Sequence, residues 1–124
     1  MIGISIVIVN YKSWYHLSKC LDSILNQTYT DFNLLIIDDD SNDSTFDILK
    51  VLESNDKRIK IFKNSENIGL TRSLNKLINL SNKKYIARQD ADDISMQDRF
   101  FNFIHYIEDG DIDIYSTPAY TINE

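Results

Sequence analysis

The sequence of 124 residues has few of the residues on which several protein classes depend. Its single cysteine, Cys20, cannot build a disulfide framework or a thiolate zinc site within the chain, and its apolar helical surroundings indicate a packing role. One proline and three glycines leave no stretch typical of a flexible linker. No apolar run approaches the roughly 20 residues of a membrane-spanning helix. The sequence therefore predicts a single globular domain with no integral membrane segment.

Basic residues are also in short supply, with 13 Lys and Arg against 19 Asp and Glu, for a formal net charge of −6. Proteins that hold nucleic acid through its phosphates need a basic face, so no nucleic-acid partner is expected. A polybasic membrane anchor is disfavoured for the same reason. The apolar fraction of 43% is high enough for a packed core, which excludes a disordered acidic tail.

Short β-branched runs alternate along the chain with apolar residues at helical spacing. Strands are expected at residues 4–9, 34–37, 59–62, 85–87 and 112–115, and helical stripes at 17–25, 48–52, 70–78 and 100–107. This alternation predicts an α/β fold, a doubly wound and mainly parallel sheet with helices on both faces. The first two strands are the most continuously apolar, so we expect them to be central.

Hydroxyl and acidic residues predict where two of the helices begin. Ser13 can cap the first helix, and Ser95 with Asp98 matches a capping box before the last one. Both assignments depend on the side chain reaching a free N–H group in the first helical turn.

Ligands bind to a doubly wound sheet beyond the carboxyl ends of its strands, where the strand order reverses. The residues that follow the first four predicted strands are therefore of interest. They are Asn10-Tyr11, Asp38–Asp40, Asn67–Arg72 and Asp90–Asp93.

The acidic residues gather at this predicted edge in two groups, within residues 38–43 and 90–98. A divalent cation would offset their mutual repulsion, and oxygen ligands without histidine or cysteine favour Mg²⁺ or Mn²⁺ over zinc. Asp90 and Asp92, two residues apart in a turn, could both reach such an ion. A site with one or two carboxylates usually needs substrate phosphates to complete it, which points to a metal–diphosphate ligand. Local turn and cap hydrogen bonding is the open alternative for both groups.

Other ligand-binding motifs do not fit. The turn after the first strand has no glycine, which excludes a nicotinamide-binding fingerprint, and no P-loop is present. A calcium loop starting at Asp90 would need glycine and glutamate where Ser95 and Phe101 stand. A phosphoacceptor receiver domain fits the length, but Asn10 and the Lys63-Asn64 pair occupy the places of its acids.

Five segments of the chain carry a further pattern. They are Ile4–Tyr11, Ser23–Tyr29, Ile36–Ser41, Asn67–Asn75 and Tyr85–Asp93, the last containing the D-x-D sequence Asp90-Ala91-Asp92. In order and spacing they resemble the family 2 glycosyltransferases of the GT-A, Rossmann-like fold, over essentially the whole chain.

The resemblance implies a nucleotide-sugar donor site, with a UDP-sugar as the expected donor. It places Val9, Asn10 and Tyr11 at the base, with Tyr11 as a stacking face. It also places Asp38 and Asp39 in the nucleotide-sugar site, where Asp39 would accept a hydrogen bond from a base N–H. Gly69 would let the backbone approach the donor, while Arg72, with Arg88, would offer positive charge. The remaining predicted site residues are Asp90, Ala91 and Asp92.

The resemblance also implies a divalent metal, Mn²⁺ or Mg²⁺, with Asp92 as its ligand and Asp90 near the metal or ribose. The acceptor would be a glycan or a lipid-linked sugar, and transfer to its hydroxyl would invert the anomeric centre. Family members often build surface polysaccharides, so we expect a cytoplasmic protein or one peripheral to the inner membrane face.

Members of this family usually continue well past 124 residues, and their catalytic base lies in the later half. No residue here matches that base. We therefore expect residues 1–124 to form a single nucleotide-sugar-binding domain, truncated before the acceptor and catalytic-base part, that transfers sugar poorly alone. A non-catalytic nucleotide-binding or receiver-like regulatory module is the alternative.

Overall fold

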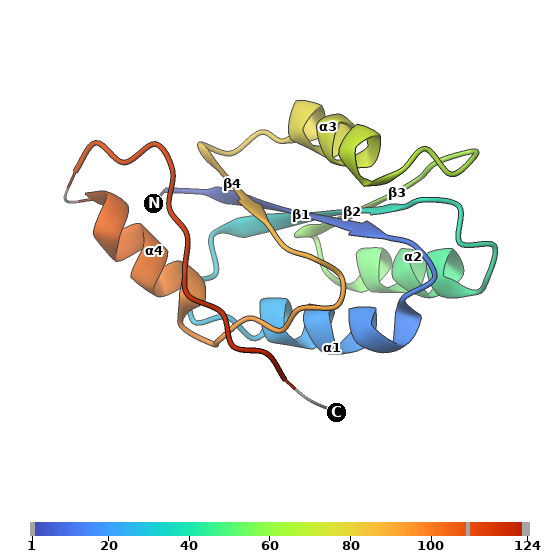
Figure 1. Cartoon of the computed structure of the whole chain (residues 1–124), viewed down its shortest axis with the longest axis horizontal. Coiled ribbons are helices and arrows are strands. Elements are labelled where there is room, and N and C mark those ends of the chain that lie inside the picture. Colours follow the sequence, from blue (N-terminus) through green and yellow to red (C-terminus); the bar gives the residue numbers. More distant parts are fainter. Residues whose placement is uncertain (1, 109, 123–124) are drawn as a thin grey trace.

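The computed structural model describes residues 2–108 and 110–122. Strands and helices alternate along the chain, as the sequence predicts (Figure 1). In order they are β1 (Ile4–Asn10), α1 (Trp14–Leu25), β2 (Phe32–Asp38), α2 (Thr45–Asn55), β3 (Ile59–Lys63), α3 (Leu70–Leu80), β4 (Tyr85–Arg88) and α4 (Arg99–Glu108).

The four strands form one parallel sheet in the order β3-β2-β1-β4. The two most apolar strands, β1 and β2, are central, which confirms the expectation, and the alternating β3 is at an edge. The chain builds outward from β1 to β3 and then returns to place β4 on the other side of β1. The strand order therefore reverses between β1 and β4, where ligands bind in sheets of this type.

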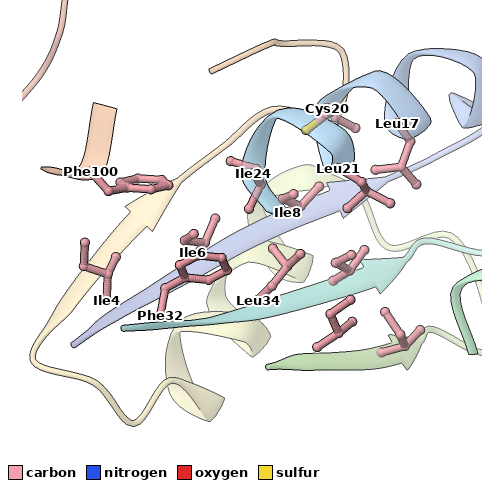
Figure 2. Close-up of a cluster of buried hydrophobic side chains, with 14 of the residues drawn as sticks. Ile4, Ile6, Ile8, Leu17, Cys20, Leu21, Ile24, Phe32, Leu34 and Phe100 are labelled. Carbon is pink, nitrogen blue, oxygen red and sulfur yellow. The ribbon is translucent and has the colours of Figure 1, made fainter. Parts of the chain in front are cut away.

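Helices cover both faces of the sheet (Figure 1). Helix α3 packs on one face with Val7, Leu35 and Ile37, while α1, α2 and α4 cover the other. Successive strand residues point to opposite faces, so β1 and β2 each contribute to both layers. Figure 2 shows the larger cluster, in which side chains of β1, β2 and α1 pack together with Phe100 of α4.

The edge strand β4 is shorter than its neighbour β1. Arg88, the last residue of β4, lies opposite Val7 in the register, whereas β1 continues to Asn10 opposite Asp38 of β2. The chain leaves the sheet after Gln89, whose N–H still donates to the carbonyl of Val7 (3.1 Å). Because β4 ends before β1, a recess remains beside the last residues of β1, at the edge where the strand order reverses.

The prediction of a fifth strand at residues 112–115 is wrong, because these described residues are not in a strand. The segment instead follows α4 and lies against it. The Tyr115 ring stacks on Tyr106 (5.6 Å between centroids) and contacts Phe103 (5.4 Å). The alternation of Asp and Ile resembles a strand pattern, but aromatic packing on α4 determines the position of the segment.

Ser13 stands at the N-cap position of α1, as predicted, but neither Ser13 nor the pair Ser95 and Asp98 makes the predicted side-chain cap, since these side chains bond elsewhere. The Ser13 hydroxyl donates to the carbonyl of Tyr11 (3.0 Å) rather than accepting from α1. The Ser95 hydroxyl donates to Gln89 Oε1 (2.8 Å), and Asp98 Oδ1 accepts from the Thr28 hydroxyl (2.9 Å). Ser95 and Asp98 therefore connect distant segments instead of closing the first turn of α4.

Within the described residues, no helix is long and apolar enough to cross a membrane.

Candidate functional site

An open cleft of about 480 Å³ lies at the carboxyl edge of the sheet, where β4 stops short of β1. This volume is within the range of small-molecule sites. The residues lining it are Val9, Tyr11, Ser13, Asp39, Asn67, Gly69, Leu70, Leu74, Gln89, Asp90, Ala91 and Asp92. The structure thus brings seven of the ten predicted site residues into one cleft, from the ends of all four strands. Their roles in binding a ligand remain predictions.

Three predicted site residues, Asn10, Asp38 and Arg72, lie outside the set that lines the cleft. Asn10 and Asp38 are buried neighbours at the ends of β1 and β2, and Asn10 Nδ2 donates to Asp38 Oδ1 (3.1 Å). The hydroxyl of Ser41 donates to the same oxygen (2.6 Å). Arg72 is an exposed residue of the first turn of α3. A direct ligand contact of Asn10 or Asp38 is therefore not supported by their geometry.

Asn10 and Asp38 instead shape the turn that carries Tyr11. Ser41, bonded to Asp38, accepts a hydrogen bond from the backbone N–H of Lys12 (2.9 Å). Lys12 has a φ of +51°, a left-handed conformation that non-glycine residues adopt at a cost. The buried polar pair thus holds a strained turn, and the Tyr11 ring remains 44% exposed at the mouth of the cleft.

Asp39 is a buried carboxylate in the cleft wall, with 2% of its surface exposed. Its Oδ1 accepts hydrogen bonds from the N–H of Ile68 and the amide of Asn64 (both 2.9 Å), and its Oδ2 accepts one from the N–H of Gly69 (2.9 Å). Burial alone would raise the pKa of Asp39, but these bonds and one from Ser73 outweigh burial, so its pKa is lowered. Asp39 therefore remains ionised and can only accept hydrogen bonds.

The loop before α3 is folded around Asp39. The amide of Asn64 also donates to Ser73 Oγ (2.9 Å), while Lys76 Nζ donates to Asn64 Oδ1 (2.9 Å), which fixes the orientation of the amide. Gly69 has φ +86° and ψ 169°, a combination that only glycine adopts readily. This conformation turns its N–H toward Asp39 and leaves open space at its α-carbon.

Three carboxylates gather on the loop after β4. Asp90, Asp92 and Asp93 are exposed, and each can place one oxygen within 4.8 Å of the others. Burial, then Asp90 and Asp92, raise the pKa of Asp93, and Arg99 partly opposes them. Asp90 also pairs with Arg88, whose Nη2 lies 3.2 Å from Asp90 Oδ1. This all-oxygen group, here called the acidic triad, fits Mg²⁺ or Mn²⁺ by its chemistry.

Sequence reasoning proposed Asp90 and Asp92 as metal ligands and missed Asp93. The D-x-D motif contains only alternate residues, so it includes Asp90 and Asp92 and leaves out Asp93. The position of Asp93 directly after Asp92 was the sequence signal that could have identified it. It also missed Gln89, a buried residue whose Nε2 donates to the carbonyl of Asp93 (3.0 Å).

Gln27 is a second buried amide that sequence reasoning left without a role. It follows α1, and its Nε2 donates to the carbonyls of Ser23 (3.0 Å) and Met96 (2.7 Å). Its Oε1 accepts from the N–H of Phe100 (3.2 Å). One side chain thus attaches the segment that follows the acidic triad to the end of α1.

Cys20 lies against the acidic loop without being reactive. Its thiol is 3.5 Å from the carbonyl of Asp90, and the side chain is fully buried. Burial raises the pKa of Cys20 to about 12, so the thiol stays protonated at neutral pH. The packing role predicted from the sequence agrees with this burial.

The chain is similar to known proteins both in sequence and in fold. The sequence profile of glycosyl transferase family 2 matches residues 5–124. An uncharacterised glycosyltransferase of Methanocaldococcus jannaschii is 37% identical over 98% of this chain and 43% of its own length. The Escherichia coli UDP-Glc:α-D-GlcNAc-diphosphoundecaprenol β-1,3-glucosyltransferase WfgD is 37% identical over 73% of this chain and 35% of its own. The chain thus spans less than half the length of these relatives.

Two solved structures share the fold at low sequence identity. Staphylococcus aureus TarS, residues 1–349, in complex with UDP-GlcNAc has a TM-score of 0.80 at 18% identity, over 95% of this chain and 37% of that 1–349 chain. A mannosyltransferase of Pyrobaculum calidifontis in complex with GDP-Man and Mn²⁺ has a TM-score of 0.68 at 18% identity, over 73% of this chain and 28% of its own. The family match over residues 5–124 and the parallel α/β sheet agree, and the chain belongs to glycosyl transferase family 2.

Proposed function

We propose that this chain is the donor-binding part of a glycosyltransferase, which holds a nucleoside-diphosphate sugar with the help of a divalent cation. The observation that carries the proposal is the shared cleft, where an exposed aromatic ring, an ionised buried carboxylate and two acids of the triad, Asp90 and Asp92, meet. The family match and the nucleotide complexes of the two structural neighbours support it.

The base of the nucleotide would bind between Tyr11 and Asp39. The exposed Tyr11 ring offers a stacking face, and base stacking on aromatic rings is worth about 1–3 kcal/mol. Asp39 Oδ1 accepts the hydrogen bonds from Ile68 and Asn64, and Oδ2 accepts the bond from Gly69 described above. Each oxygen of an ionised carboxylate can accept more than one hydrogen bond. Oδ2 can therefore accept a hydrogen bond from an N–H of uracil, thymine or guanine. Among these bases we propose uracil, with a UDP-sugar as the donor.

The diphosphate would lie toward the acidic triad, with Asp92 and Asp90 as metal ligands and Asp93 within reach. A bound Mn²⁺ or Mg²⁺ would act there as a Lewis acid and template for the departing nucleoside diphosphate. Gly69, without a side chain, leaves room for the donor beside the cleft wall.

The reaction we propose is attack of an acceptor hydroxyl on the anomeric carbon of the donor, with inversion. It requires a general base near that hydroxyl, and we assign none among the cleft residues. The acceptor would be a glycan or a lipid-linked sugar, as the name of the WfgD relative suggests. The setting we propose is the cytoplasm or the inner face of the membrane.

The decisive experiment is a titration with UDP, GDP and dTDP, with Mn²⁺ and with EDTA. We expect metal-dependent binding that is strongest for UDP and is lost in Asp92→Asn. Asp47→Asn is the matched control, because it removes the same charge from an exposed position on α2, outside the cleft. Absence of binding to all three nucleotides would refute the proposal and favour a non-catalytic module on the same fold.

A further inference from the structure

Arg99, the first residue of α4, lies directly behind the loop that carries the acidic triad. Its guanidinium donates hydrogen bonds to Gln89 Oε1, to Ser95 Oγ (3.0 Å) and to the carbonyl of Arg88 (3.3 Å). Two of these partners, Gln89 and Ser95, are buried, with 4% and 8% of their surfaces exposed. Nothing in the proposed chemistry of the donor uses this arginine.

The three acceptors are distributed along the whole loop. Arg88 and Gln89 begin it at the end of β4, and Ser95 stands at its far end. The amide of Gln89 continues the connection, since its Nε2 donates to the carbonyl of Asp93 (3.0 Å). Arg99 thus links both ends of the loop of residues 88–95, and the Gln89 amide extends this link to the backbone of Asp93.

Arginine suits this position because of its shape. The planar guanidinium presents several N–H donors in a fixed fork, so one side chain can hold several acceptors in a set geometry. A lysine ammonium at the end of a flexible stem would carry the same charge without this fork.

The charge of Arg99 alone would act against a metal site. A partly buried cation next to the triad repels a divalent ion, so electrostatics predicts that removing Arg99 should tighten metal binding. A geometric role predicts the opposite, because groups behind the ligands of a metal orient those ligands. The direction of the change in metal affinity therefore distinguishes an electrostatic role of Arg99 from a geometric one.

We propose that Arg99 is a positioning residue, which holds the loop of residues 88–95 so that Asp90, Asp92 and Asp93 converge on a divalent cation. The inference rests on the proposed function, since it assumes that the triad binds metal. It adds a residue outside the cleft on which the metal affinity of the cleft depends.

The test measures the affinity for Mn²⁺ alone, from the electron paramagnetic resonance signal of free Mn²⁺, in the wild type and two variants. Arg99→Met should raise the Kd for Mn²⁺ by about tenfold or more, the usual cost of losing a group behind metal ligands. Arg99→Lys should recover less than half of this loss on a logarithmic scale, because it restores the charge but not the fork. Ser95→Ala, which removes one acceptor, should have a smaller effect in the same direction.

Two controls separate positioning from general damage. Arg58→Met removes the same charge near the opposite edge of the sheet, where Arg58 pairs with Asp56, and should leave the Kd within about twofold. Leu49→Ala creates a cavity under α2 and should lower the melting temperature without changing the Kd. Far-ultraviolet circular dichroism should report a folded domain in every variant compared.

Unchanged or tighter Mn²⁺ binding in Arg99→Met would overturn the inference, as would full recovery in Arg99→Lys. If Arg99→Met fails to fold, Ser95→Ala and Arg99→Lys provide the test. Unchanged Mn²⁺ affinity in both of these variants would also overturn the inference. If Mn²⁺ binds only in the presence of UDP, the same comparison is made with UDP present. A wild-type chain that binds no Mn²⁺, either alone or with UDP, would refute the metal site of the proposed function itself, which is a separate and recognisable result.

Discussion

Replacing Asp39 with asparagine tests the most heavily bonded acid of the cleft. The substitution keeps the shape of the side chain, removes the charge and turns one acceptor oxygen into an NH₂ group. If the remaining oxygen keeps the bonds from Ile68 and Asn64, the NH₂ group faces the N–H of Gly69, and two donors meet. If the amide is reversed, two donors lose their acceptor instead of one.

The cost follows from these bonds. Hydrogen bonds to a charged group contribute about 1.5–3 kcal/mol each, against about 0.5–1.5 kcal/mol for neutral pairs. Two bonds weakened by about 1 kcal/mol each, and one buried N–H left unsatisfied at about 1–3 kcal/mol, give a total of about 3–5 kcal/mol. That is a large part of the about 5–15 kcal/mol by which domains are usually stable.

Urea unfolding of wild type and Asp39→Asn at pH 7, followed by circular dichroism and by fluorescence of the single tryptophan, measures this difference. Asp47→Asn on the exposed side of α2 should change stability by less than about 0.5 kcal/mol. A loss below about 1 kcal/mol in Asp39→Asn would refute the view that the loop before α3 depends on this carboxylate.

The same pair of proteins makes a prediction about pH. The pKa of Asp39 in the folded chain lies below its ordinary value of 3.8, so the carboxylate stabilises the fold fully above that value. This stabilisation is lost as the pH falls through the folded-state pKa. The difference between wild type and Asp39→Asn should therefore stay constant from pH 7 to about pH 5 and narrow below about pH 4. A gap that narrows near neutral pH would contradict the lowered pKa.

Three further substitutions or reactions test other parts of the structure. Cys20, buried and with a pKa raised to about 12, should react with a disulfide reagent at pH 8 at least about 100-fold more slowly in the native chain than in urea, and equal rates would contradict its burial. Gly69→Ala should cost about 1–3 kcal/mol although no atom lies within 4 Å of the added methyl group, because φ is +86° there; an unchanged melting temperature would show that the backbone can relax. Gln27→Ala removes three hydrogen bonds from a buried site and should lower the free energy of unfolding by about 2 kcal/mol or more, whereas a shift in urea midpoint within error would show that water replaces the amide.

The sequence carried most of the information about the sheet. Unbroken β-branched runs marked β1 and β2 as central strands, because only strands covered on both faces can be apolar at nearly every position. The same reasoning failed at residues 112–115. A short alternating segment has the same pattern whether it pairs with a sheet or rests on a helix, and the rings of Phe103 and Tyr106 decide between these outcomes.

The candidate site was predictable to the level of segments but not of side chains. Strand periodicity implies that Asp38 and Asp39 point to opposite sides, yet it does not say which side borders the cleft. In the structure Asp38 is buried against Asn10, and Asp39 lines the cleft. The sequence could not predict the hydrogen bonds of Gln27, Gln89 and Arg99. Their partners are set by the folded arrangement of the loops, and none of the three residues belongs to a recognised motif.

The unequal lengths of β1 and β4 have a consequence for how this fold can vary. The cleft exists because a strand ends early, and no bulky insertion is needed to create it. Its depth is therefore set by a count of residues at the end of β4, where Arg88 stops opposite Val7. Adding or deleting a residue there would change the width of the cleft, and it would also displace Ala91, which lines the cleft and packs in the larger hydrophobic cluster. The size of the cleft and the packing of that cluster are therefore coupled through the short loop after β4.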